Sequence, residues 1–144
     1  MKRHIPGLHS HQQDGEHPLE GLFLVRVEWA SYRWHPQRAS LQLRFVVLEP
    51  QAFERRSFSG RLYCTERALW KLNWFLRDFG YDMELLAQDQ IDEKALINLR
   101  GVVRTTHVTL NGHVFQNLKA FAPTSEWDEL AHGEASEAQT QERR

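Results

Sequence analysis

The chain has 144 residues, 18 Lys plus Arg against 19 Asp plus Glu, a net charge of −1 and a single cysteine, Cys64. This length supports one domain with an ordinary hydrophobic core, and one cysteine excludes an internal disulfide. No apolar run approaches the ~20 residues that a membrane-spanning helix needs, and the first residues lack the apolar segment of a signal peptide. We therefore expect a cytoplasmic protein that does not enter membranes.

Alternating apolar and polar residues predict three strands in the first half of the chain. The first covers residues 23–29, with Trp29 on the core side, and the second covers residues 41–47. A third strand is expected over residues 57–64. The polar stretch 31–40 between the first two is expected to be a loop or a strand end that bends.

The apolar period then changes to that of a helix. Thr65 is a suitable N-cap and Gly80 is placed to end the helix as a C-cap. An acidic stretch follows, with a short helix expected to begin near Asp92. The pattern therefore places one main helix after the third strand.

Two β-rich segments, 102–110 and 113–121, are joined by Asn111-Gly112, which favours a two-residue type I′ hairpin. The resulting order is three strands, a helix and two strands. This is the order of an OB-fold barrel, although other small α+β folds share it. We predict a mainly β domain, a five-stranded OB-like barrel with a helix between strands 3 and 4.

Composition divides the chain into three parts. Residues 1–20 contain prolines, glycines and four histidines and predict a flexible N-terminal arm. Residues 21–123 form the predicted OB-like domain, and residues 124–144 an acidic, disordered C-terminal tail.

The near-zero net charge is the sum of basic and acidic stretches that are separated along the sequence. Residues 21–77 contain ten basic and four acidic residues, whereas residues 78–99 contain one basic and six acidic residues. Residues 124–144 contain two basic and six acidic residues. Nucleic-acid-binding domains are often strongly basic overall, but the total of −1 does not exclude a basic face on the strands.

Arginine and aromatic residues recur at the non-core positions of the first three strands and their first connection. If these strands pair antiparallel, the side chains share one face of the sheet, where arginine neutralises phosphate and aromatic rings stack on bases. The candidate nucleic-acid-binding residues are Arg26, Tyr32, Arg33, Trp34, Arg44, Arg61 and Tyr63.

The same residue types also suit roles without nucleic acid. Exposed arginines and tyrosines can be solvated strand positions that discourage edge pairing. Trp70 and Trp74 lie four residues apart on the helix, among basic residues. They could form an aromatic and basic second face, but we favour packing residues. A protein interface is also enriched in arginine and aromatic residues, so composition does not separate the two kinds of partner.

The sequence contains few candidates for catalytic or metal-binding residues. Cys64 with His107 is the one candidate nucleophile–base pair, and Cys64 is better explained as a buried small residue because it shares a strand face with apolar residues. Histidines 4, 9, 11 and 17 lie in the predicted arm, without the spacing of a zinc site. We expect no catalysis, metal or cofactor.

Several segments carry a resemblance to a known family. It covers about residues 21–123, and its segments are Gly21-Leu-Phe-Leu-Val-Arg-Val-Glu, Leu41-Gln-Leu-Arg-Phe-Val-Val-Leu-Glu49, Gly60-Arg-Leu-Tyr, Thr65 to Gly80, Leu99-Arg-Gly101-Val-Val, and Asn117 with Phe121. The pattern resembles a phage and mobile-element family of small, OB-like proteins similar to single-stranded DNA-binding proteins. The resemblance implies a role in DNA replication or recombination.

One departure from bacterial-type single-stranded DNA-binding proteins concerns the end of the chain. Those proteins end in an acidic tip with a terminal apolar residue that recruits partners, whereas this chain ends in Gln141-Glu-Arg-Arg144. The departure argues against the usual way of recruiting partners.

The leading hypothesis is a non-enzymatic protein that binds single-stranded nucleic acid, DNA in the first instance. The alternative is a protein-interaction adapter or a scaffold subunit of a larger nucleoprotein complex. Its partners would be replication, recombination or effector-complex proteins, and self-association into a homo-oligomer is left open.

Overall fold

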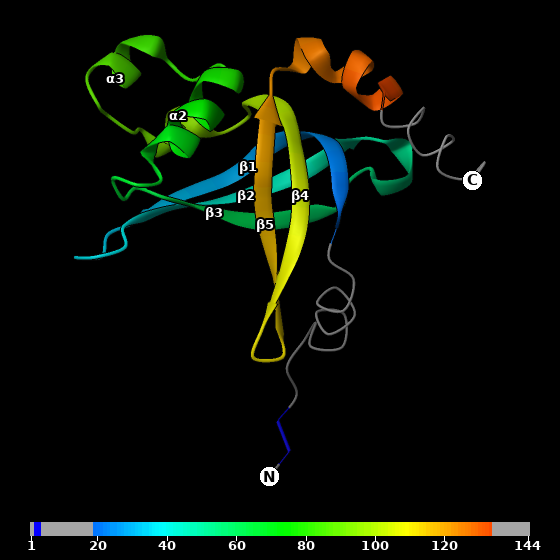
Figure 1. Cartoon of the computed structure of the whole chain (residues 1–144), viewed down its shortest axis with the longest axis horizontal. Helices are drawn as coiled ribbons and strands as arrows, with labels where there is room; N and C mark the ends of the chain where they lie inside the picture. Colours follow the sequence, from blue (N-terminus) through cyan, green and yellow to red (C-terminus); the bar gives the residue numbers. More distant parts are fainter. Residues whose placement is uncertain (1, 4–18, 134–144) are drawn as a thin grey trace.

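The computed structural model describes residues 2–3 and 19–133. A five-stranded antiparallel sheet dominates, with short helices at one end (Figure 1). Residues 127–133 are also helical. The elements with their bounds are β1 Gly21–Arg33, β2 Ser40–Glu49, η1 Gln51–Phe53, β3 Ser57–Tyr63, α2 Leu69–Asp78, α3 Met83–Ala87, α4 Glu93–Leu96, β4 Arg100–Leu110, β5 His113–Ala122 and η2 Thr124–Glu126.

The strand order in the sheet is β3-β2-β1-β4-β5, and every neighbouring pair is antiparallel. This confirms a mainly β fold of five strands with helices between strands 3 and 4. Closure into a barrel is not confirmed, because no hydrogen-bonded ladder joins the edge strands β3 and β5.

The edge strands nevertheless approach each other at Gly60 of β3. A Cβ atom placed on Gly60 would lie 2.5 Å from Cγ of Leu118, a buried residue of β5. The Leu118 side chain therefore occupies the space that any larger residue at position 60 would need.

Strand β1 belongs to both halves of the sheet. Its residues 21–26 pair with β4, and residues 24–33 pair with β2. The β1–β2 register shifts between Val27 and Trp29, which leaves Glu28 as the extra residue of a β-bulge. A bulge bends a strand and increases its twist. Figure 1 shows that the sheet is strongly twisted, with β4 and β5 crossing in front of the other strands.

Within the core, a cluster of phenylalanine rings joins α2 to the sheet. The Phe75 ring of α2 lies 5.3 Å from that of Phe121 and 6.1 Å from that of Phe45, measured between centroids. Phe79 continues this cluster, with its ring 4.6 Å from that of Phe75. These aromatic contacts hold the helix against the strands because each ring buries a large apolar area.

The predicted start of α2 is wrong, and its predicted end is confirmed. Residues 65–68 form a turn, so the N-cap is Ala68, without a side-chain hydrogen bond, and not Thr65. At the other end Gly80 has a φ of 76°, and its N–H donates to the Arg77 carbonyl while the Tyr81 N–H donates to the Leu76 carbonyl. This is the Schellman geometry in which glycine is favoured.

The hairpin prediction is confirmed. Asn111 has a φ of 52° and Gly112 a φ of 79°, as the two central residues of a type I′ turn require. The stretch 31–40 contains both a strand end and a loop, because β1 continues to Arg33 and β2 begins at Ser40. Residues 31–33 alternate between the two faces of a paired strand, so their polar composition does not end it.

The expected arm and tail fall largely outside the described residues. Leu19, at the end of the expected arm, is buried, and its carbonyl accepts hydrogen bonds from Thr105 and Gln116. Residues 124–133 of the expected tail form η2 and the helix that follows it. Of the helices in the described ranges, none has the length and apolar character to span a bilayer.

Candidate nucleic-acid interface

The strand register brings five of the seven candidate residues together. Opposite residues of paired strands lie on the same face of a sheet. Arg44 lies opposite Trp29 and Ser59, Gln42 opposite Ser31 and Arg61, and Ser40 opposite Arg33 and Tyr63. Arg26 shares this face through its partner Val46, which lies two residues from Arg44. We call this surface of β1, β2 and β3 the basic face; it comprises Arg26, Trp29, Arg33, Arg44, Arg61 and Tyr63.

The prediction that Trp29 lies on the core side of the first strand is wrong. Strict alternation from Val27 would place it in the core, but Glu28 is an extra residue and reverses the alternation. Trp29 consequently lies 44% exposed on the basic face, directly opposite Arg44. Sequence periodicity missed this residue because it contains no signal for the bulge.

Two arginines of the basic face already have protein partners. The Arg44 Nε atom lies 3.4 Å from Oε2 of Glu28, and its guanidinium donates to Ser57 Oγ at 3.3 Å. Arg26 donates to Asn98 Oδ1 at 2.8 Å. Both side chains are therefore held in place before any ligand arrives.

Arg33 and Arg61 differ from these two arginines. Neither side chain forms a hydrogen bond or ion pair with any residue in the ranges that the structure describes. Their guanidinium groups are exposed and keep all their donors for a ligand. Arg100 of β4 lies opposite Arg26 and is also exposed, which extends the positive charge beyond the predicted set.

The remaining two candidates do not lie on the basic face. Tyr32 pairs with Leu41, whose neighbours on the same side of β2 are core residues, so Tyr32 belongs to the opposite side of the sheet. This corrects the shared face predicted for Tyr32. Trp34 follows β1 in the loop 34–39 and is 73% exposed. The Cys64 N–H donates to the Ala39 carbonyl, so this loop is adjacent to the end of β3.

The two helix tryptophans have different environments. Trp74 packs edge-on against the Phe121 ring at 5.6 Å, which agrees with its interpretation as a packing residue. Trp70 stacks on Trp74 with ring centroids 6.2 Å apart but is itself 64% exposed. The packing interpretation is therefore wrong for most of the Trp70 surface, because α2 presents this side to solvent.

Several titratable side chains outside the basic face are partly buried or have partners within the protein. Partial burial raises the pKa of the Cys64 thiol, which lowers its reactivity. Nδ1 of His107 lies 2.7 Å from the Glu20 carboxylate. Asp82 and Asp92 accept backbone hydrogen bonds as the N-caps of α3 and α4. Within residues 2–3 and 19–133, no three His, Cys, Asp or Glu side chains gather as a metal site would require; histidines 4, 9, 11 and 17 lie outside these ranges.

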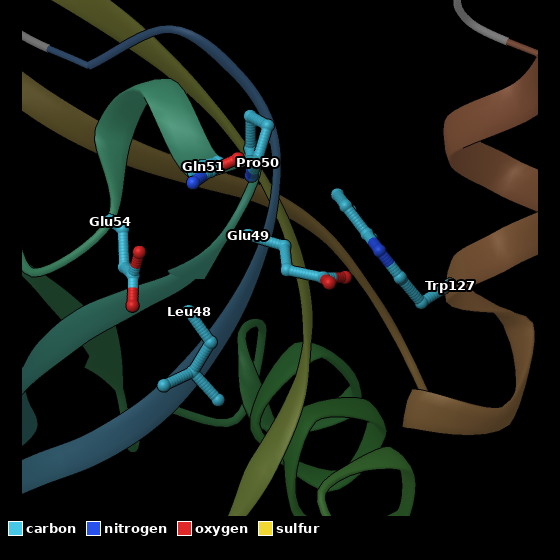
Figure 2. A pocket seen from close by; sticks show the side chains of 6 residues that line it. All are labelled: Leu48, Glu49, Pro50, Gln51, Glu54 and Trp127. Atoms are coloured by element: carbon cyan, nitrogen blue, oxygen red, sulfur yellow. The ribbon is translucent and has the colours of Figure 1, made fainter.

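A cavity of about 440 Å³ opens between the end of β2 and the helix at 127–133. Figure 2 shows the Glu49 side chain extending toward the Trp127 ring, with Glu54 on the other side of the cavity. These two carboxylates make the site repulsive to phosphate, so the cavity does not serve as an extension of the basic face. Its lining residues are Leu48, Glu49, Pro50, Gln51, Glu54 and Trp127.

The chain matches no protein-family model, and no curated protein resembles it to a significant degree.

Proposed function

We propose that this protein binds single-stranded nucleic acid, with DNA as the first ligand to test, and that it does so without catalysis. The observation that carries the proposal is the convergence of Arg26, Arg33, Arg44 and Arg61 on the face that also holds Trp29 and Tyr63. Arginines contact the phosphates, and the exposed rings stack on bases. Stacking requires unpaired bases, so the aromatic residues favour a single strand over a duplex.

The strand order also supports an OB-like barrel as the finer description of the fold. In such a barrel β3 and β5 are neighbours, and here they are the two edges that meet at Gly60 and Leu118. OB folds bind oligonucleotides on the face of strands 2 and 3, with help from the loop between strands 1 and 2. The location of the basic face on β1, β2 and β3, and of Trp34 in the loop between β1 and β2, fits this mode of binding.

The proposed setting is the replication or recombination of a phage or mobile element, in the cytoplasm. The replication or recombination setting rests on the family resemblance of residues 21–123. The cytoplasmic location rests on the lack of a run of ~20 apolar residues that could span a membrane. The basic face supports the binding activity but is independent of the setting.

Fluorescence anisotropy with a labelled single-stranded oligonucleotide tests the binding activity. Four phosphate contacts predict a plot of log affinity against log salt with a slope of about −3, since each contact to a single strand contributes about −0.7. Arg61→Ala should reduce the steepness by about 0.7. A duplex of the same sequence should bind more weakly.

A folded protein that binds no oligonucleotide at low salt, or binds with no salt dependence, contradicts the proposal. That result would favour the adapter hypothesis, in which exposed residues such as Trp70 contact another protein.

Replacing Glu28 is expected to raise oligonucleotide affinity, whereas replacing an arginine of the basic face lowers it. The Glu28 carboxylate occupies Arg44, so a phosphate must compete with Glu28 for this guanidinium. Glu28→Gln should therefore raise oligonucleotide affinity several-fold at low salt and steepen the salt dependence by up to about 0.7. Glu84→Gln is the matched control, because it removes the same charge from an exposed position on α3. Equal effects of the two variants would mean that only net charge matters.

A further inference from the structure

The β4–β5 hairpin carries a second distinctive surface, separate from the basic face. Figure 1 shows the hairpin extending beyond β3. Its exposed apolar side chains include Leu110 at 58% and Phe115 at 53% exposure. Val108 lies opposite Phe115 and is also exposed, so the two form an apolar cross-strand pair in contact with solvent. Contiguous exposed apolar side chains of this kind mark an interaction surface.

The backbone of the hairpin has an unpaired edge. Among residues 2–3 and 19–133, β5 is the last strand of the sheet and β4 is its one hydrogen-bonded neighbour. Leu118 marks the contact with β3, and residues 113–117 precede it in the part of β5 that leads to the hairpin tip. The outward N–H and C=O groups of residues 113–117 are therefore available to another strand.

Nothing in the hairpin sequence discourages such pairing. Residues 105–118 contain no Lys, Arg, Asp, Glu or Pro, the residues that usually protect an exposed edge. The other edge strand, β3, carries Arg61 and follows Arg55 and Arg56. The contrast indicates that the β5 edge is covered by a partner rather than exposed to solvent.

We propose that the partner is a second copy of this chain, with the two β5 strands paired antiparallel about a two-fold axis at Phe115. Antiparallel pairing of identical strands is symmetric, so each side chain near the axis faces its own copy or a close neighbour. A charged residue there would repel itself across the axis. A segment of 14 residues without a formal charge suits this contact, whereas a charged or basic partner would find no complementary group on it.

The centre of the contact follows from the span of the edge. Phe115 is the middle residue of 113–117, so the two copies of Phe115 lie opposite each other in the symmetric register. The paired hairpins then form one four-stranded sheet, in which Val108 and Phe115 of both copies share a face. The dimer places the two Phe115 side chains next to each other and satisfies the backbone edge in one step.

The dimer goes beyond the proposed function and does not depend on it. If the proposed function also holds, two basic faces on one particle let a single strand engage both. The second contact is then intramolecular, which raises the apparent affinity for long oligonucleotides over short ones.

Sedimentation velocity of the full chain, without nucleic acid, tests the contact. We expect a concentration-dependent dimer for the natural sequence and single chains for both Phe115→Lys and Phe115→Glu, because like charges then meet at the axis. Mixing the two variants should restore a dimer, since Lys then faces Glu. This restoration also shows that both variants are folded.

Met83→Lys is the control, because it places the same charge on another exposed apolar residue, on α3. It should leave the dimer intact. A natural chain that stays monomeric at high concentration overturns the proposal. A dimer that survives Phe115→Lys overturns it as well, because the contact would then lie elsewhere. Monomers whose oligonucleotide affinity depends on Phe115 would assign the hairpin to nucleic acid instead.

Discussion

Replacing Trp29 with alanine is expected to weaken the binding of a single-stranded oligonucleotide by about 5- to 150-fold, the equivalent of about 1–3 kcal/mol for one lost base stack. Trp29 lies opposite Arg44 on the central row of the basic face, so a base that stacks on its ring keeps the phosphates within reach of the arginines. Fluorescence anisotropy at constant salt measures the change. The salt dependence should stay the same, since no charge is removed.

Two variants make the Trp29 result interpretable. Trp29→Phe retains an aromatic ring and should recover most of the affinity. Trp70→Ala removes a tryptophan that is more exposed than Trp29 but belongs to α2, and it should leave the affinity nearly unchanged. If Trp29→Ala binds like the natural protein, or if Trp70→Ala loses as much affinity, the basic face is not the stacking surface.

Replacing Gly60 with alanine is expected to destabilise the fold by about 1–3 kcal/mol, the usual cost of adding a methyl group to a filled core. The new Cβ would lie 2.5 Å from Leu118 Cγ, and Leu118 is only 2% exposed, so its side chain has no free space to enter. Equilibrium unfolding in denaturant measures the effect. Gly133→Ala is the control, because a Cβ there meets nothing within 4 Å.

A double-mutant cycle connects this cost to the contact between β3 and β5. Leu118→Ala alone should cost about 2–5 kcal/mol because it leaves a cavity. In that background Gly60→Ala has room and partly fills the cavity, so its cost should fall to near zero. If Gly60→Ala costs the same in both backgrounds, or nothing in either, then the two edge strands are not packed as described.

Much of the fold was predictable from local patterns. The alternation over residues 41–47 predicted β2 because each second residue of a half-buried strand is apolar, and residues 41, 43, 45 and 47 are all buried. Asn111-Gly112 predicted the hairpin because both residues tolerate the positive φ of a type I′ turn. Local signals were weaker where capping was absent, and the start of α2 at Leu69 was missed for this reason.

The candidate site was predictable in part. Arg26, Arg33, Arg44, Arg61 and Tyr63 share a face because antiparallel pairing keeps alternate residues of neighbouring strands together. Tyr32 was assigned to the same group because the sequence does not show that β1 continues through it. Arg100 was missed because its position beside Arg26 depends on the pairing of β1 with β4, 74 residues apart in the chain.

The sequence by itself determined which segments alternate, where the hairpin turns and where basic residues concentrate, because these depend on neighbours along the chain. The tertiary structure decided where the charges and rings lie relative to one another. The bulge at Glu28 moved Trp29 out of the core. The side chains of Arg26 and Arg44 have protein partners, whereas the side chains of Arg33 and Arg61 form no hydrogen bond or ion pair with the described residues. These outcomes depend on strand register and side-chain contacts between distant segments. The total charge of −1 contains no information about either.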